Sequence, residues 1–140
     1  MRGHLTNEPM PSSEFKDIRE LASDALAFRS RLEGIKQANR SQEFDWYPYD
    51  PFELFPVLTS MLREERRQFA ELAGAGPILD IGCGDGALSF FFESLGCRAQ
   101  AIDSPATNYN RTLGFQRLKA ALGSAVDFEA CDLDSGLDLS

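Results

Sequence analysis

The first part of the chain carries one long helical pattern of hydrophobic residues. From Ser12 or Ser13 to about Gln37, apolar residues recur every three or four positions, at Phe15, Ile18, Leu21, Ala25, Phe28, Leu32 and Ile35. This spacing puts them on one side of an amphipathic helix. The stripe is short for a coiled-coil dimer, so we expect it to pack against the rest of the chain. Residues 1–12 contain few apolar residues and predict a flexible tail.

An aromatic segment follows this helix. Six aromatic residues fall within residues 44–55, namely Phe44, Trp46, Tyr47, Tyr49, Phe52 and Phe55. They predict either anchors that hold the N-terminal arm against the domain or a lid over a ligand, with anchoring the simpler interpretation. Asp50-Pro51-Phe52-Glu53 has the residue order of a helix start, with an acid as N-cap and proline at the first helical position. This second helix should run to Gly74 or Gly76, with Pro56 kinking its first turns or marking its true start.

Short strands alternate with helices from Pro77 onward. We expect strands at 77–81, 98–102 and 125–130, with helices at 87–95 and about 107–122. Strand–helix–strand units joined by short links predict a parallel sheet with right-handed crossovers. The fold class is therefore α/β, with N-terminal helices before the sheet. We divide the chain into residues 1–45, a tail and amphipathic helix, and residues 46–140, which contain the sheet.

The loop after the first strand carries the strongest chemical signal. The strand runs directly into Gly82-Cys83-Gly84-Asp85-Gly86, where glycines allow a sharp turn and the close approach of a ligand. In open parallel sheets, ligands bind beyond the carboxyl ends of the strands, next to the free N–H groups of a helix. Asp80, Asp103 and Asp132 stand at or beside such strand ends. They predict a site for a nucleoside-bearing ligand, in which Asp103 accepts hydrogen bonds from the ribose.

Two kinds of nucleoside ligand compete for this loop. Residues 82–87 also satisfy the dinucleotide pattern G-x-G-x-x-G/A, so an NAD(P)-dependent oxidoreductase domain is one alternative. An anionic pyrophosphate would meet Asp80 and Asp85, at a cost of about 1–3 kcal/mol for each like-charge contact at about 5 Å. A ligand with sulfonium and ammonium groups gains from the same acids. No Lys-Ser or Lys-Thr follows the loop, which excludes a P-loop NTPase.

These residues resemble a known family. Residues 78–86, with the sequence ILDIGCGDG, are similar to the first signature of class I S-adenosylmethionine-dependent methyltransferases. Ala101-Ile102-Asp103 resembles the segment whose acid holds the ribose, and Ala130-Cys131-Asp132-Leu133 resembles the segment that contacts adenine. The resemblance implies a Rossmann-like parallel sheet that binds S-adenosyl-L-methionine. It implies these cofactor-binding residues: Asp80, Gly82, Cys83, Gly84, Asp85, Gly86, Asp103, Ser104, Asp132 and Leu133.

The resemblance covers residues 77–134 and only the first three strands of such a domain. We therefore expect the chain to be a truncated methyltransferase domain, its cofactor-binding half, without the strands that shape the acceptor site. The aromatic segment is also similar to that of the tRNA wobble-uridine methyltransferase-like family. The methyl acceptor stays open between a small molecule, a protein and RNA, and no catalytic residue is assigned.

Charge and rare residues narrow the function further. The formal net charge is −8, and the basic cluster Arg63, Arg66 and Arg67 stands beside Glu64 and Glu65. We therefore expect no nucleic-acid binding from these residues alone. One histidine and three separated cysteines predict neither a metal site nor a disulfide framework.

Two remaining interpretations concern reactivity and location. Cys83 and Cys131 are disfavoured as nucleophiles because the sequence offers no activating base. No apolar run approaches the roughly 18 residues of a membrane span, which favours a cytoplasmic protein that does not bind membranes.

A second alternative function is a non-catalytic interaction fragment that keeps the fold and works through the first helix and the aromatic segment.

Overall fold

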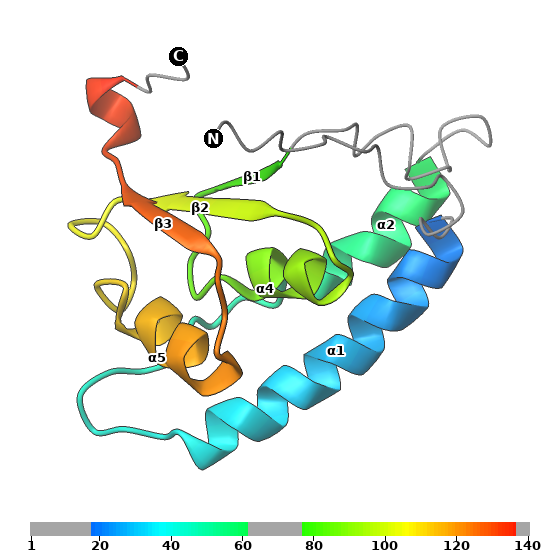
Figure 1. The fold of residues 1–140 in the computed structure, drawn as a ribbon, viewed down its shortest axis with the longest axis horizontal. Coiled ribbons are helices and arrows are strands. Elements are labelled where there is room, and N and C mark those ends of the chain that lie inside the picture. Colours follow the sequence, from blue (N-terminus) through cyan, green and yellow to red (C-terminus); the bar gives the residue numbers. More distant parts are fainter. Residues whose placement is uncertain (1–17, 62–76, 137–140) are drawn as a thin grey trace, which may run out of the picture.

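The described part of the chain folds around a parallel sheet. The computed structural model describes residues 18–61 and 77–136. Within these ranges, strands β1 (Ile78–Ile81), β2 (Ala99–Asp103) and β3 (Asp127–Ala130) pair in the order β1-β2-β3, and both pairs are parallel. Helices α4 (Ala87–Ser94) and α5 (Leu113–Leu122) connect the strands and lie against one face of the sheet (Figure 1). The predicted α/β class and parallel sheet are confirmed.

Two further helices precede the sheet. Helix α1 (Ile18–Ala38) crosses α4 and α5 on the side away from the sheet, and α2 (Leu54–Met61) lies beside α1 (Figure 1). A short 3-10 turn, η1 (Pro51–Glu53), leads into α2, and Oδ1 of Asp50 accepts a 3.0 Å hydrogen bond from the backbone N–H of Phe52. The helix start predicted at Asp50 is confirmed. Pro56 lies in the first turn of α2, where its missing N–H has no helical partner to lose.

The hydrophobic stripe of α1 forms part of the core. Four of its predicted positions are buried, namely Leu21, Ala25, Phe28 and Leu32. Phe28 contacts Phe91 of α4, which also contacts Phe52 and Phe55. The ring centroids of Phe28, Phe52 and Phe55 lie 5.6, 5.8 and 5.6 Å from that of Phe91. Burying one such side chain stabilises the fold by about 1.5–3 kcal/mol. The stripe therefore packs against the chain's own α/β part, as predicted.

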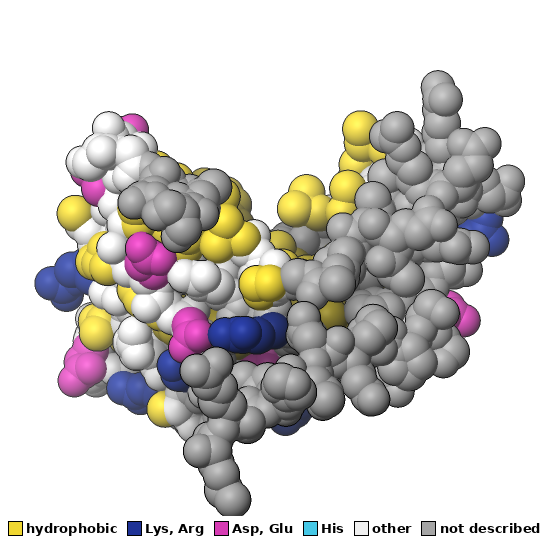
Figure 2. Space-filling view, turned by 45° about the horizontal axis from the view of Figure 1, so that its top comes forward, with side chains coloured by type: hydrophobic (Ala, Val, Ile, Leu, Met, Phe, Trp, Pro, Cys, Tyr) yellow, Lys and Arg dark blue, Asp and Glu magenta, His cyan; other side chains and the backbone are white. Residues whose placement is uncertain are grey.

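The two faces of the sheet differ in how far other elements cover them. Asp80 of β1 accepts a 2.7 Å hydrogen bond from the hydroxyl of Ser89 in α4, so this face packs on the helices. The alternate positions Leu79 and Ile81 point to the opposite face and are 37% and 50% exposed. Hydrophobic side chains are visible on this side of the molecule (Figure 2). Because α4 and α5 both pack on the first face, they leave the apolar side chains of β1 open on the second.

Helix α5 begins later than the sequence predicts. The expected start was about Thr107, but the helix starts at Leu113 and residues 104–112 form turns. Oδ1 of Asn108 accepts hydrogen bonds from the backbone N–H groups of Asn110 at 3.2 Å and Thr112 at 2.8 Å. These bonds give the backbone an alternative to the helix, so the prediction of a helix from Thr107 is wrong.

The other strand and helix bounds from β1 to β3 agree with the prediction within two residues. Some predictions lie outside the described residues: the tail of residues 1–12, the helix start at Ser12 or Ser13, the arginine cluster, and the helix end at Gly74 or Gly76.

Candidate functional site

Glycine shapes the loop between β1 and α4. Gly82, Gly84 and Gly86 have φ angles of +72°, +59° and +83°, which residues with a Cβ adopt only with strain. A Cβ on Gly86 would stand 2.5 Å from the ring of Phe115, so the close packing of α4 on α5 requires glycine there. A Cβ on Gly82 would meet nothing within 4 Å. The loop is therefore tightly packed at its helix end and open at Gly82, next to the carboxyl end of β1.

Asp103 ties the end of β2 to this loop. Its Oδ2 accepts hydrogen bonds from the backbone N–H of Gly84 and from the side-chain amide of Asn108, both at 2.9 Å. Its Oδ1 accepts a 2.8 Å hydrogen bond from the backbone N–H of Ser104. An ionised carboxylate offers about four acceptor positions. Three are used within the protein, which leaves one on Oδ1 for a ligand.

Asp85 connects the loop to the aromatic segment. The residue is 4% exposed, and its Oδ2 accepts a 2.7 Å hydrogen bond from the backbone N–H of Tyr47. Its Oδ1 accepts a second 2.7 Å hydrogen bond from the side-chain amide of Asn110. Both carboxylate oxygens are therefore engaged inside the fold, and Asp85 acts on the shape of the loop.

The sequence interpretation missed two asparagines that complete this network. Asn108 and Asn110 are each 5% exposed. Besides its bond to Asp85, the amide of Asn110 donates to the backbone carbonyl of Asp45 at 3.1 Å and accepts from the backbone N–H of Gly114 at 3.2 Å. The sequence did contain a signal for them, the segment Asn-Tyr-Asn between a strand-ending acid and a helix. Asparagine favours turns and hydrogen bonds to the nearby backbone, so this segment indicates a turn.

The aromatic segment both anchors the arm and covers the loop. The indole N–H of Trp46 donates a 3.2 Å hydrogen bond to the carbonyl of Lys36, and Phe52 is 3% exposed in the core. The ring of Tyr47, in contrast, lies 3.5 Å from the position that a Cβ on Gly84 would take. It also contacts the rings of Tyr49 and Tyr109, at centroid distances of 6.4 and 5.5 Å. The three tyrosines of the chain therefore form one group, in which Tyr47 lies next to the glycine loop.

The loop lies in a negative electrostatic environment. Burial raises the pKa of Asp80 above its ordinary value of 3.8, hydrogen bonds from Ser89 oppose this rise, and the charge of Asp103 adds to it. Burial also raises the pKa of the Cys83 thiol well above its ordinary value, and the charges of Asp80, Asp103 and Asp85 raise it further. Cys83 is therefore a neutral thiol at physiological pH, and this environment does not activate it as a nucleophile.

The other predicted residues lie along the same edge of the sheet. Ser104 follows β2, and its carbonyl accepts a 2.8 Å hydrogen bond from the backbone N–H of Asn108. Asp132 caps a separate 3-10 turn, η3 (Leu133–Ser135), by accepting a 3.0 Å hydrogen bond from the backbone N–H of Asp134. Leu133 is 47% exposed. Asp80, Cys83, Gly84, Asp85 and Asp103 are thus brought together, whereas the hydrogen bonds of Asp132 stay within its own turn.

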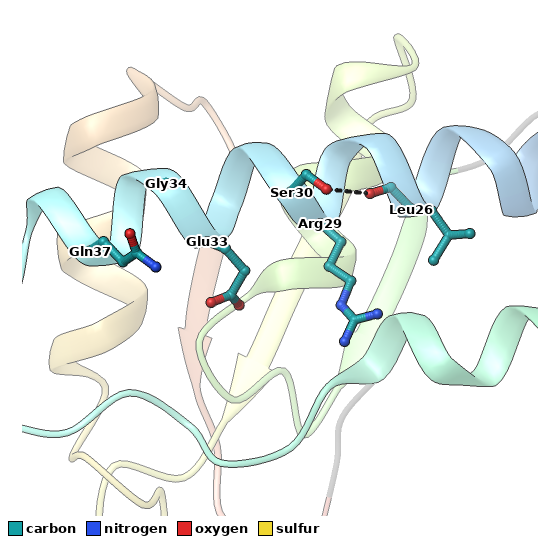
Figure 3. Close-up of a pocket in the computed structure, with 6 residues that line it drawn as sticks. All are labelled: Leu26, Arg29, Ser30, Glu33, Gly34 and Gln37. Carbon is teal, nitrogen blue, oxygen red and sulfur yellow. Dashed lines mark hydrogen bonds between the residues drawn. The ribbon is translucent and has the colours of Figure 1, made fainter.

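Two hollows lie on the N-terminal arm. One, of about 590 Å³, follows the outer side of α1, where Arg29 and Glu33 extend toward the neighbouring segment (Figure 3). The second, of about 230 Å³, lies between α1 and residues 47–52 and reaches Ala87, the first residue of α4. Neither is lined by Gly82, Gly84 or Asp103.

Two kinds of feature are absent from residues 18–61 and 77–136. No group of three or more His, Cys, Asp or Glu side chains is placed to hold a metal ion in the part that the structure describes. No helix in residues 18–61 or 77–136 is long and apolar enough to cross a membrane.

Comparison with known proteins gives no family for the chain. It matches no protein-family model, and neither the curated proteins nor the solved structures contain a significant match.

Proposed function

We propose that this chain is the cofactor-binding half of an S-adenosylmethionine-dependent methyltransferase with a Rossmann-like sheet. The observation that carries the proposal is the 2.9 Å hydrogen bond from the backbone N–H of Gly84 to Oδ2 of Asp103. It joins a left-handed glycine loop after β1 to the acid that ends the neighbouring parallel strand β2. Nucleoside cofactors of α/β proteins bind at such a junction, beyond the carboxyl ends of the strands.

The residues present fit this cofactor at three points. Gly82 faces open space, so the backbone there can be approached closely, and Oδ1 of Asp103 keeps one acceptor position for a ribose hydroxyl. Asp80, beside the loop, would attract the ammonium and sulfonium charges. When bound, the cofactor supplies a methyl group on an already activated sulfonium. The residues of the chain then contribute mainly alignment, which can lower the barrier by several kcal/mol.

The charge at the loop favours this cofactor over NAD(P). Asp80, Asp85 and Asp103 all act on the thiol of Cys83, which lies within the loop. Their combined field repels the pyrophosphate of a dinucleotide and attracts a cation. This observation supports the sulfonium cofactor, although the glycine pattern alone fits both.

Calorimetric titration with S-adenosylhomocysteine tests the proposal, with NAD titrated in parallel. We expect saturable binding of the homocysteine nucleoside, none of NAD, and at least about a tenfold loss of affinity in Asp103→Ala. Asp127→Ala, which removes an exposed acid of β3, is the matched control and should bind as the wild type does. Near-UV circular dichroism should show that both variants keep ordered aromatic packing. Binding of NAD instead, or no binding by the ordered wild-type chain, would overturn the proposal.

A further inference from the structure

Within residues 18–61 and 77–136, helices cover only one face of the sheet. Helices α4 and α5 pack on the face that carries Asp80 (Figure 1). Leu79 and Ile81 of β1 point to the opposite face, called the second face below, and are 37% and 50% exposed. Purely parallel sheets occur almost only with both faces covered, because their strands are apolar on both sides. The second face therefore has the features of a surface that another helix covers.

The strand register shows which side chains share the second face. Paired residues of neighbouring parallel strands point to the same side of a sheet. The register therefore adds two side chains of β2 and two of β3 to those of β1, namely Gln100, Ile102, Asp127 and Glu129. The side-chain amide of Gln100 donates a 3.0 Å hydrogen bond to a carboxylate oxygen of Glu129, which agrees with this placement.

The second face is apolar along one edge and acidic along the other. Its exposed apolar side chains belong to β1, because Ile102 of the central strand is only 1% exposed. Asp127 and Glu129 are exposed on β3, and the three strands contain no Lys or Arg. In the space-filling view, hydrophobic side chains lie along a hollow on this side of the molecule (Figure 2). The surface thus offers apolar contact and negative charge side by side.

One α-helix is wide enough to contact both edges. Neighbouring strands lie about 4.8 Å apart, so the side chains of β1 and β3 are separated by about 10 Å across the sheet. An α-helix with its side chains has a diameter of about 10–12 Å. A helix that lies along the strands can therefore place apolar side chains on β1 and long basic side chains beside the two acids of β3.

The charge of the second face favours a basic occupant. The chain has a formal net charge of −8, and the exposed acids of β3 have the same sign. A second copy of the chain would bring the same net charge to the contact and would be repelled. A helix with Lys or Arg beside its apolar side chains complements both edges of the face.

We propose that the second face binds an amphipathic helix of a partner protein, with apolar residues on one side and Lys or Arg on the other. The apolar residues pack on Leu79 and Ile81, and the basic residues pair with Asp127 and Glu129. This interaction goes beyond the proposed cofactor site, and none of these four residues belongs to that site. The result of the S-adenosylhomocysteine titration therefore does not decide it.

Titrations of the full chain with two labelled synthetic peptides test the charge of the occupant. The first peptide has about 14 residues, roughly 21 Å of helix, with leucine on one helical face and lysine on the other. The second has glutamate in place of each lysine. Fluorescence anisotropy should show saturable binding of the lysine peptide, with a dissociation constant on the order of 10 μM, and at least about tenfold weaker binding of the glutamate peptide. Equal binding of the two peptides would overturn the proposal.

Charge reversal on two sides of the molecule separates a local contact from a general effect of net charge. Glu129→Lys should weaken binding of the lysine peptide at least about fivefold, because it puts a positive charge beside the peptide. Glu33→Lys makes the same change in net charge on α1, where this side chain is 59% exposed and lies on the side away from the sheet. It should change the affinity less than about twofold. Equal losses in the two variants would contradict a site on the second face.

A second pair of variants tests the apolar contact. Ile81→Thr keeps a β-branched side chain in the strand but makes it polar, and should weaken binding of the lysine peptide at least about threefold. Leu26→Gln makes an apolar-to-polar change at a 48% exposed position of α1 and should leave the affinity unchanged. Near-UV circular dichroism should show ordered aromatic packing in both variants. An unchanged affinity in Ile81→Thr would overturn the proposal.

Light scattering tests the competing occupant. The wild-type chain should be a monomer without the peptide, because two copies repel each other. A dimer that Ile81→Thr dissociates would assign the second face to another copy of this chain and overturn the proposal of a basic partner helix.

Discussion

The side-chain amide of Asn110 donates a 2.7 Å hydrogen bond to Oδ1 of Asp85, across 25 positions of sequence. Both residues are buried, and each also bonds to the aromatic segment, Asp85 to the N–H of Tyr47 and Asn110 to the carbonyl of Asp45. This pair therefore fixes the glycine loop, the turn before α5 and the N-terminal arm relative to one another.

Replacing Asn110 should cost considerable stability. Asn110→Ala leaves one oxygen of the buried Asp85 carboxylate without its donor, a loss of about 2–3 kcal/mol. Urea denaturation followed by Trp46 fluorescence would measure it. Asn39→Ala is the matched control, because the amide of Asn39 bonds the carbonyl of Ile35 near the end of α1 and should cost less than about 1 kcal/mol. Equal losses in the two variants would argue against a special role for the Asn110–Asp85 pair.

Two glycine-to-alanine changes in helices should have opposite effects. A Cβ on Gly114 of α5 would stand 2.5 Å from the amide nitrogen of Asn110 and overlap Oδ1 of Asp85, so Gly114→Ala should destabilise the fold by about 1–3 kcal/mol. A Cβ on Gly34 of α1 would meet nothing within 4 Å. Gly34→Ala should therefore stabilise the fold by about 0.5–1 kcal/mol through helix propensity. Thermal unfolding of both variants checks the pair, and a stabilised Gly114→Ala would contradict the packing described here.

The carboxyl of Asp80 should make stability depend on pH. Burial raises its pKa in the folded state, so the folded chain binds its proton more tightly than the unfolded chain does. The contribution of Asp80 to stability therefore falls as pH rises from its ordinary pKa of 3.8 through the raised folded value, and it stays low at neutral pH.

Asp80→Asn removes this penalty while its amide oxygen can still accept from the hydroxyl of Ser89. We expect a gain on the order of 1 kcal/mol at pH 7 and a smaller gain near pH 4.5, measured by urea denaturation. Asp127→Asn, an exposed acid of β3, should stay close to the wild type at both pH values. A loss of stability in Asp80→Asn at pH 7 would show that the charge of Asp80 stabilises the fold.

Alanine substitutions at two glycines separate the effect of backbone strain from the effect on ligand access. Gly82 and Gly96 have φ angles of +72° and +85°, and a Cβ on either would meet nothing within 4 Å. Alanine at each position should cost a similar 1–2 kcal/mol, roughly, because the left-handed conformation is strained for a residue with a Cβ. Only Gly82→Ala should also abolish S-adenosylhomocysteine binding, since Gly96 lies at the far end of α4. Equal affinities of the two variants would place the ligand away from Gly82.

Local sequence patterns were sufficient to predict most of the secondary structure. The three-to-four spacing on α1, the Asp50-Pro51 helix start and the alternation of strands and helices after Pro77 were all predicted from residues adjacent in sequence. Such patterns depend on side-chain periodicity and on local backbone chemistry, which the sequence displays directly. The start of α5 was predicted too early. The side chain of Asn108 accepts hydrogen bonds from the N–H groups of Asn110 and Thr112, which a helix starting at Thr107 would need.

The α/β class, the glycine loop and the acids at the strand ends could be predicted from the order of residues alone, because they follow from periodicity and from the conformations that only glycine adopts freely. The contacts of those acids, in contrast, depend on the packed fold. Asp103 accepts a hydrogen bond from the backbone N–H of Gly84 in the loop. Asp85 accepts hydrogen bonds from the backbone N–H of Tyr47 and from the side-chain amide of Asn110. Partners 19 to 38 positions apart in sequence meet only when the strands, helices and arm pack together, so no local pattern could reveal them.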